Sequence, residues 1–237
     1  MRLSAYCYTN QGGRDHNEDS VRCCAEQGIF VLADGLGGHG SGEVASALAA
    51  DVLFAGCPAH PDPDGLSELF RKANEAVMEG QKVPGQEEMK TTAVALSVAG
   101  DRAVWGHVGD SRLYRFSAGT LTQETRDHSV TYMKYLGGEI SYMDVYHDDD
   151  RSSLLRALGK LPCKPETGQA RLRPGDAFLL CSDGFWEYVY QEEMLADLLK
   201  AETPEQWAEG MLLRHIRRTP PGNDNFSLIT VFAEEEL

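Results

Sequence analysis

Several carboxylates stand directly beside apolar segments of the sequence, next to glycine or serine, instead of on polar faces. They are Asp34 in VLADG, Asp110 in HVGDSR, Asp183 in LLCSDG and Asp224 in GNDNFS, with Glu18 and Asp19 together in HNEDS. A carboxylate beside a buried segment loses its hydration unless a partner or a metal ion compensates it. One aspartate of this kind is ordinary turn chemistry. Four favour a shared site, because a sheet brings strand ends together in space.

The chemistry of this set follows from its ligand atoms. All are oxygens, with no cysteine or histidine spacing, which suits Mg²⁺ or Mn²⁺ better than Zn²⁺. Gly35 follows Asp34, and without a side chain its carbonyl can approach an ion while Asp34 bridges to a second one. Two ions bridged at ~3.5–4 Å lower the pKa of a shared water. The pattern therefore predicts hydrolysis of phosphate esters.

The same stretch has a second interpretation. Gly35, Gly37 and Gly40 spell the G-x-G-x-x-G of a dinucleotide-binding loop. That motif needs a second parallel strand and an acidic residue about 20 positions later, whereas the sequence continues into the proline-broken FAGCPAHPDPDG. A dinucleotide-dependent oxidoreductase is thus the weaker alternative. A cysteine-based phosphatase is disfavoured as well, because no cysteine has an arginine at C-x₅-R spacing.

Length and charge narrow the class of protein. The 237 residues suffice for one sizeable domain, and no apolar run approaches the ~20 residues of a membrane span. The net charge of −15 argues against nucleic acid as a partner. We expect a cytoplasmic protein, since the first residues lack the apolar stretch of a secretory signal. The cysteines form no C-x-x-C pair and are interpreted as small buried hydrophobic residues: Cys7, Cys23, Cys24, Cys57, Cys163 and Cys181.

Short strands and helix pairs must position the acidic residues. Alternating apolar residues predict strands at 28–33, 92–98, 102–108, 112–116, 177–181 and 226–232. Hairpin turns at 99–101 and 117–120 make the middle of the chain an antiparallel meander. Helical spacing predicts helices at 44–53, at 66–77 behind an Asp64 cap, at 192–200 and after Thr203-Pro204. The fold class is mixed α and β layers, and the acidic run 144–150 is expected in a solvated surface loop.

These segments, taken in order, resemble a known family. GGRDHNEDS, VLADGLGGHGSGEVAS, TTAVALSV, AVWGHVGDSRLYRF, LTQETRDHS, LLRALG, LLCSDGFWEYV and GNDNFSLITV are similar to the metal-dependent protein phosphatases (PPM, protein phosphatase 2C-type) in their compact bacterial form. The match runs from Thr9 to Phe232. It implies an α+β fold of four αββα layers, with one domain over 1–237. It also implies a serine/threonine phosphatase whose metal-activated water attacks phosphorus without a covalent phosphoenzyme.

The resemblance assigns two to three Mn²⁺ or Mg²⁺ ions to the acidic set. Asp34 bridges two ions, Asp183 and Asp224 complete the ligands of the first, and Glu18, directly or through water, and the Gly35 carbonyl bind the second. Asp19 supports these ligands, and Asp110 with Asp183 holds a third, weaker ion.

Two further residues are candidates for the catalytic chemistry. Arg14 matches the family's phosphate-binding arginine, whose planar fork suits two phosphate oxygens. Many members have a histidine directly after the DG pair as candidate general acid, but here Leu36 stands there. His39 is the substitute candidate, with a structural role at the helix start and protonation by a metal-bound water as alternatives. His16, His107 and His128 have no stronger claim.

The resemblance also identifies a variable flap over about 121–156. Its tyrosines, Tyr132, Tyr135, Tyr142 and Tyr146, and its acidic run suit a mobile cover that meets a substrate protein. The implied partners are Ser/Thr-phosphorylated proteins and a cognate Ser/Thr kinase, with the phosphatase a monomer that binds neither nucleic acid nor membrane. A phosphatase-like scaffold without turnover is the remaining alternative. It is disfavoured because every carboxylate of the family's set is present.

Overall fold

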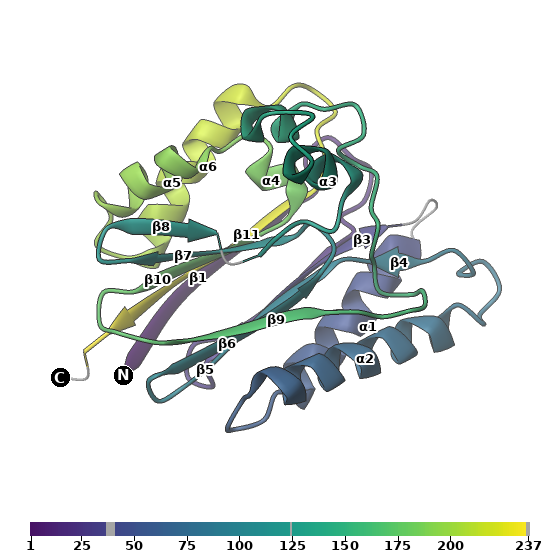
Figure 1. Cartoon of the computed structure of the whole chain (residues 1–237), viewed down its shortest axis with the longest axis horizontal. Helices are drawn as coiled ribbons and strands as arrows, with labels where there is room; N and C mark the ends of the chain where they lie inside the picture. Colours follow the sequence, from purple (N-terminus) through teal and green to yellow (C-terminus); the bar gives the residue numbers. More distant parts are fainter. Residues whose placement is uncertain (37–40, 124, 236–237) are drawn as a thin grey trace.

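Two antiparallel sheets face each other in the computed structural model, which describes residues 1–36, 41–123 and 125–235 (Figure 1). The first sheet has the strand order β1 (Arg2–Asn10), β11 (Phe226–Glu234), β10 (Ala177–Cys181), β7 (Arg112–Ser117) and β8 (Thr120–Gln123). The second has the order β2 (Asp19–Cys24), β3 (Ile29–Leu36), β5 (Ala93–Ala99), β6 (Arg102–Val108) and β9 (Glu166–Arg171), with the short β4 (Lys90–Thr91) paired to β3.

Helices cover the outer face of each sheet (Figure 1). The second sheet carries α1 (Ser41–Gly56) and α2 (Pro63–Gly80), and the first carries α4 (Asp183–Trp186), α5 (Gln191–Leu198) and α6 (Pro204–Arg218). Between β8 and β9 lie the short helix α3 (Val130–Leu136) and the 3₁₀ helix η1 (Tyr142–Tyr146). The predicted four-layer αββα fold is confirmed.

Strand alternation divides the core into three layers. In β3, Val31 and Ala33 pack under α1 and α2, whereas Phe30 and Leu32 enter the layer between the sheets. In β10, Leu179 faces the C-terminal helices and Phe178 faces the second sheet. Because both faces of these strands are buried, their sequences are nearly continuous runs of apolar residues.

The antiparallel register collects strand ends at one rim of the sandwich. Asp19 at the start of β2 lies opposite Asp34 near the end of β3. Cys181 at the end of β10 pairs with Leu228 of β11 on one side and with Arg112 at the start of β7 on the other. Segments that enter or leave these strands therefore meet at the same rim, although they are far apart in the sequence.

Strands β1, β2 and β9 are not among the predicted elements. They are edge strands of their sheets, and most of their residues are only partly buried. A half-buried edge strand has a weak apolar alternation, as in ETGQAR of β9. These strands form because they pair with a neighbouring strand, and their own sequence pattern does not predict them.

Helix starts show one correct and one wrong prediction. Thr203 caps α6, because its Oγ1 accepts a hydrogen bond from the Gln206 amide at 3.2 Å. The predicted Asp64 cap of α2 is wrong. Asp62 is the cap, and its Oδ1 accepts from the Asp64 and Gly65 amides at 3.0 and 2.9 Å. Pro63 then takes the first helical position, where its missing N–H costs nothing.

Within the segment 121–156, the described residues 125–156 are anchored to the body of the protein. Tyr146 is buried and packs edge-on against Trp186, with ring centroids 5.7 Å apart. Tyr146 thus holds this segment in place instead of facing a substrate, as the flap prediction implied. In the acidic run, Asp148 and Asp150 pair with Lys134 at 3.0 and 2.7 Å. Within the described ranges, no helix has the length and apolar character needed to cross a membrane.

Candidate metal centre at the rim of the sandwich

A cavity of about 240 Å³ opens at the rim where these strand ends meet. It is lined by Arg14, Glu18, Asp34, Gly35, Leu36, Asp110, Ser152, Leu154, Asp183 and Asp224. The structure therefore brings together nearly all of the predicted site residues. Asp19 lies beside the cavity without lining it, and His39 falls outside the residues that the structure describes. Arg14 is the only basic side chain in this described lining.

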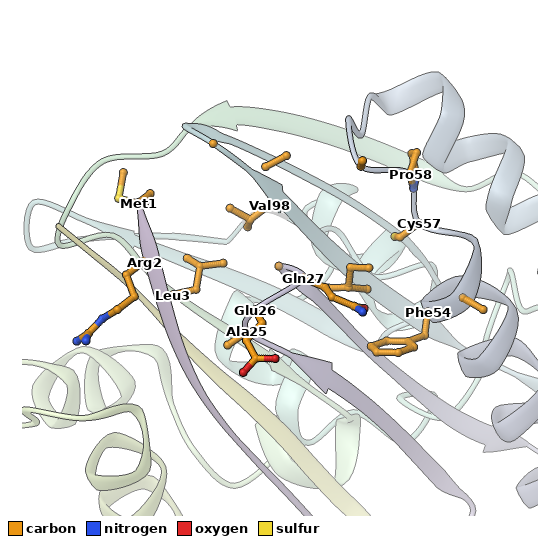
Figure 2. A pocket seen from close by; sticks show the side chains of 16 residues that line it. Met1, Arg2, Leu3, Ala25, Glu26, Gln27, Phe54, Cys57, Pro58 and Val98 are labelled. Carbon is orange, nitrogen blue, oxygen red and sulfur yellow. The ribbon is translucent and has the colours of Figure 1, made fainter. Parts of the chain in front are cut away.

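A larger cavity lies elsewhere. Its volume is about 1250 Å³, and it lies at the other end of β3 and β5, beside Gly28 and Gly100 (Figure 2). Its lining includes Phe54, Pro58 and Val98 and a single carboxylate, Glu26. Size alone would point to this cavity, but it lacks the convergent acidic groups that the predicted chemistry needs.

Asp34 is fixed through its backbone. Its carbonyl oxygen accepts hydrogen bonds from the Thr91 hydroxyl at 2.7 Å and from the Thr92 amide at 2.8 Å. Its own amide donates to Thr92 Oγ1 at 3.3 Å. These bonds orient the carboxylate into the cavity from a rigid strand. Thr91 and Thr92 were not predicted as part of the site.

Gly35 permits close approach of three chain segments. A Cβ at this position would lie 2.2 Å from the Gly42 carbonyl oxygen and 2.6 Å from the Glu18 carbonyl oxygen. The start of α1 packs against this point, and the Gly42 amide donates to the Glu18 carboxylate. Glu18 is thereby held at a helix N-terminus, where a negative charge is favoured. Any side chain at Gly35 would force these segments apart.

Asp19 is buried behind the cavity, with 7% of its surface exposed. Its Oδ2 accepts hydrogen bonds from Ser182 at 2.9 Å and from Ser227 at 2.6 Å. Its Oδ1 has no hydrogen-bond partner among the described residues. Burial raises the pKa of Asp19 to about 7 despite these hydroxyl donors. An orphaned buried carboxylate oxygen is a group that a cation or a cation-bound water would satisfy.

The cavity acids disfavour one another's charge. Burial raises the pKa of Asp34, Asp110 and Asp183, and repulsion from neighbouring carboxylates raises it further. Asp34 and Asp183 also form a side-chain hydrogen bond, which requires a proton on one of them. Divalent cations would replace that proton and cancel the repulsion. The residues present therefore fit a centre of hard cations.

Arg14 stands at the mouth of the cavity. Its Nη2 lies 2.8 Å from Asp224 Oδ2, and its side chain is 56% exposed. Asp224 thus holds one edge of the guanidinium and leaves its other donors available for a phosphate.

One amide side chain organises the loop that carries Arg14. Asn225 Nδ2 donates to the carbonyl oxygens of Gln11 and His16, both at 2.8 Å, and its Oδ1 accepts from the Glu18 amide at 2.8 Å. Asn225 was missed as a site residue, although it stands beside Asp224 in the quoted GNDN segment.

The flap contributes residues that the sequence did not single out. Ser152 and Leu154 line the cavity beside Asp34 and Asp183. A bridge between Ser129 and Leu154 fixes this part of the segment. No composition signal marks these two residues, because they reach the site through the path of an irregular loop.

A histidine cluster lies behind the loop that carries Asp110. His107, His128 and Glu166 offer ligand atoms within 4.8 Å of one another, the one such trio of potential ligands in the described part of the chain. However, His128 Nδ1 accepts the Gly109 amide at 3.1 Å, and Arg156 Nη1 lies 3.0 Å from both His128 Nε2 and Glu166 Oε1. A guanidinium already occupies the place that a cation would take. We therefore assign this cluster to structure.

Comparison with known proteins agrees with this geometry. The family model for protein phosphatase 2C matches residues 10–212. The serine/threonine protein phosphatase PstP of Mycobacterium tuberculosis is 35% identical over 225 residues, which cover 91% of this chain and 42% of that protein. The serine/threonine phosphatase stp of Listeria monocytogenes is 32% identical over 92% of this chain and 90% of that protein. The chain thus spans less than half the length of the PstP relative.

Solved structures agree over almost the whole chain. A crystal structure of M. tuberculosis PstP/Ppp superposes with a TM-score of 0.89 at 31% identity, covering 99% of this chain and all of that one. The PstP catalytic domain in complex with two manganese ions gives a TM-score of 0.88 at 30% identity, covering 99% of each chain. The chain belongs to the protein phosphatase 2C family.

Proposed function

We propose that this protein is a metal-dependent protein serine/threonine phosphatase that hydrolyses phosphoserine and phosphothreonine in proteins. The observation that carries the proposal is the rim cavity, where five carboxylates from separate segments surround a space with one basic side chain among its described lining residues. Such a site attracts divalent cations and, through them and Arg14, a phosphate. The family and the names of the relatives support the same activity.

The residues divide the work by position. Asp34, Asp183, Asp224, Glu18 and the Gly35 carbonyl would hold the two principal cations, Mn²⁺ or Mg²⁺, and Asp110 with Asp183 would hold a third. When bound, these cations supply Lewis acidity and lower the pKa of water. Asp19, anchored by Ser182 and Ser227, sets the start of β2 from which Glu18 projects.

Arg14 and the flap would bind the substrate. The guanidinium of Arg14 would bind two phosphate oxygens while Asp224 keeps it oriented. Ser152 and Leu154 border the cavity from the flap side, where the residues around a phosphorylated side chain would lie. His39 remains a proposed proton donor to the leaving hydroxyl.

Three further assignments stay predictions from the sequence. They are a cognate Ser/Thr kinase that the phosphatase opposes, a monomeric state and a cytoplasmic location.

The test uses protein stripped of metal with a chelator and then titrated with Mn²⁺. Release of phosphate from a phosphothreonine peptide should depend on Mn²⁺ and should be lost in Asp34→Asn, while the circular dichroism spectrum is unchanged. A scaffold without turnover would bind the phosphopeptide and release no phosphate at any Mn²⁺ concentration. That result would reject the proposed activity.

A further inference from the structure

Two cysteines face each other across the open edge of the sandwich. Cys7 lies on β1, an edge strand of the first sheet, and Cys23 lies on β2, an edge strand of the second. Cys7 pairs with Ile229 and Cys23 with Phe30. Both of these partners belong to the apolar layer between the sheets. Because paired residues share a face of a sheet, both thiols point into the edge of that layer.

The thiols are in contact there. Their side chains form a hydrogen bond with each other. Cys7 is exposed, whereas Cys23 is partly buried against the inner layer. One sulfur is thus open to solvent reagents, and the second stands directly behind it. The prediction that all six cysteines are buried hydrophobic residues is wrong for Cys7, and only Cys181 is fully buried, because the other four are partly buried.

We propose that Cys7 and Cys23 form a reversible disulfide that joins the two sheets at their open edge, and that hydroperoxides are the oxidants that produce it. This inference is independent of the phosphatase activity, because it uses no residue of the rim cavity.

The reaction proceeds in two balanced steps. The Cys7 thiolate attacks one oxygen of hydrogen peroxide, which gives a sulfenic acid on Cys7 and releases hydroxide. The Cys23 sulfur, as thiolate, then attacks the Cys7 sulfur and expels hydroxide, which takes up the proton lost from Cys23 and leaves as water. The hydroxide released in the first step takes up a proton from solvent. Two cysteine sulfurs are thus oxidised by two electrons in total, and one peroxide is reduced to two waters. A small thiol reverses the bridge by exchange.

The local chemistry assigns the two roles. The hydrogen bond from Cys23 lowers the pKa of Cys7 to about 6, so Cys7 is largely thiolate at neutral pH. The same hydrogen bond, and to a smaller extent burial, raise the pKa of Cys23. An exposed, low-pKa thiol beside a second thiol is the usual arrangement of an oxidation-sensitive pair.

The other cysteines lack this arrangement. Cys24 pairs with Ile29, which packs toward α1 and α2, so its side chain lies on the opposite face from Cys23. Cys57 and Cys163 pack against that same helical layer, and Cys181 is fully buried. Cys24 is therefore the matched control, since it is adjacent in sequence and different only in the face that it occupies.

The bridge would close a ring that contains site residues without reaching the site itself. The segment between the two cysteines includes Arg14, Glu18 and Asp19. Cys23 lies four residues beyond Asp19 along β2, which corresponds to about 13 Å. The disulfide would thus tie together the strands on either side of the Arg14 loop and leave the rim carboxylates in place.

The test is oxidation of the Mg²⁺-loaded protein with excess hydrogen peroxide. Free thiols are then blocked with N-ethylmaleimide, and peptides are identified by mass spectrometry without reduction. We expect a peptide pair joined through Cys7 and Cys23, absent in Cys7→Ser and in Cys23→Ser and retained in Cys24→Ser. The oxidised protein should unfold roughly 5–10 °C higher than the reduced protein, as expected for a loop of this length.

Other results would overturn the inference. They are a Cys23–Cys24 bridge, a bridge that survives Cys7→Ser, or conversion of Cys7 to sulfinic acid with no bridge at all. A disulfide that lowers the unfolding temperature would mean that the bond strains the fold. That result would contradict the inference that β1 and β2 already place the two sulfurs close enough to bond.

Discussion

Two groups of charged side chains, one buried and one partly buried, lie close together in this protein, and their charges are compensated differently. Arg112 and Asp127 are 0% and 1% exposed and form a two-pronged ion pair, with Nε–Oδ1 at 2.9 Å and Nη2–Oδ2 at 2.6 Å. The guanidinium also stacks on Trp186 at 3.4 Å from the ring centroid. Among the described residues, the rim acids Asp34, Asp110 and Asp183 have no such ion-pair partner. Asp110 is buried and Asp34 and Asp183 are partly buried, and the loss of hydration raises the pKa of all three.

This difference distinguishes a charged pair with a structural role from a group of acids with a proposed functional role. Arg112 and Asp127 neutralise each other within the chain and need no ion from solution. Their ion pair also joins β7 to the start of the flap. A group of buried and partly buried acids without such a counter-ion keeps an electrostatic cost, which remains until cations bind from solution. The two groups are linked, because Trp186, which stacks on Arg112, also donates its indole N–H to the Asp110 carbonyl oxygen at 3.0 Å.

The largest expected effect comes from neutralising a rim acid. Asp183→Asn should lower Mn²⁺-dependent phosphate release by roughly a thousandfold, because Lewis-acid stabilisation is worth several kcal/mol. The metal-free variant should unfold at the same temperature as wild type or higher, since repulsion is removed. Asp101→Asn, at an exposed pair with Arg171, is the matched control and should keep full activity. Wild-type turnover in Asp183→Asn would refute its role.

Breaking the complete pair should instead reduce stability. Arg112→Met leaves Asp127 buried without its cation, and the free energy of unfolding should fall by about 3 kcal/mol. Urea unfolding measures this loss. The double variant Arg112→Met/Asp127→Leu should recover part of it, because no unpaired charge remains. Equal losses in the single and double variants would show that packing, and not the unpaired charge, accounts for the effect.

A third buried group near the rim is kept neutral, which predicts a pH dependence. Burial lowers the pKa of His128 from 6.5 to about 4. Between pH 6.5 and 4, His128 is protonated in the unfolded chain and neutral in the folded protein. The free energy of unfolding therefore falls as the pH falls across this window. The contribution to the slope is about 1.4 kcal/mol per pH unit.

The variant His128→Asn tests this assignment in the same pH window. Its amide oxygen can still accept the Gly109 N–H, and its stability should vary less steeply with pH than that of wild type. The exposed His60→Asn is the control and should retain the wild-type slope. An unchanged slope in His128→Asn would show that this histidine does not titrate as described.

The smallest expected effect concerns Arg14 at the mouth of the cavity. Arg14→Ala should raise KM for a phosphopeptide by roughly tenfold, the value of one charge-assisted hydrogen-bond pair. Steady-state kinetics at saturating Mn²⁺ separate KM from kcat. A large fall in kcat with an unchanged KM would contradict a role in phosphate binding.

The convergence of the acidic residues at one rim could be predicted from the sequence, because they carry local signals. Asp34, Asp110 and Asp183 follow apolar strands and stand beside glycine or serine, and those strands are recognisable from their alternation. The layer order follows from the family resemblance, and the structure confirms it. Local signals also place α1, α2, α5 and α6, apart from the shift of one cap from Asp64 to Asp62, whereas the short helices α3, α4 and η1 were not predicted.

Other features depend on tertiary contacts and have no local signal. Asn225 acts by reaching Gln11 and His16, which are more than two hundred residues away in the chain. Asp127 is marked only by its partner Arg112. Ser152 and Leu154 reach the rim through an irregular loop, and strands β2 and β9 are defined by their neighbours. The pairing of Cys7 with Cys23 likewise appears only when two edge strands from different sheets meet.

The most direct test of the central claim is anomalous diffraction from crystals of the Mn²⁺-loaded protein. We expect at least two manganese peaks inside the rim cavity, one of them in contact with both Asp34 and Asp183. Manganese bound instead at His107, His128 and Glu166, with none between Asp34 and Asp183, would contradict it.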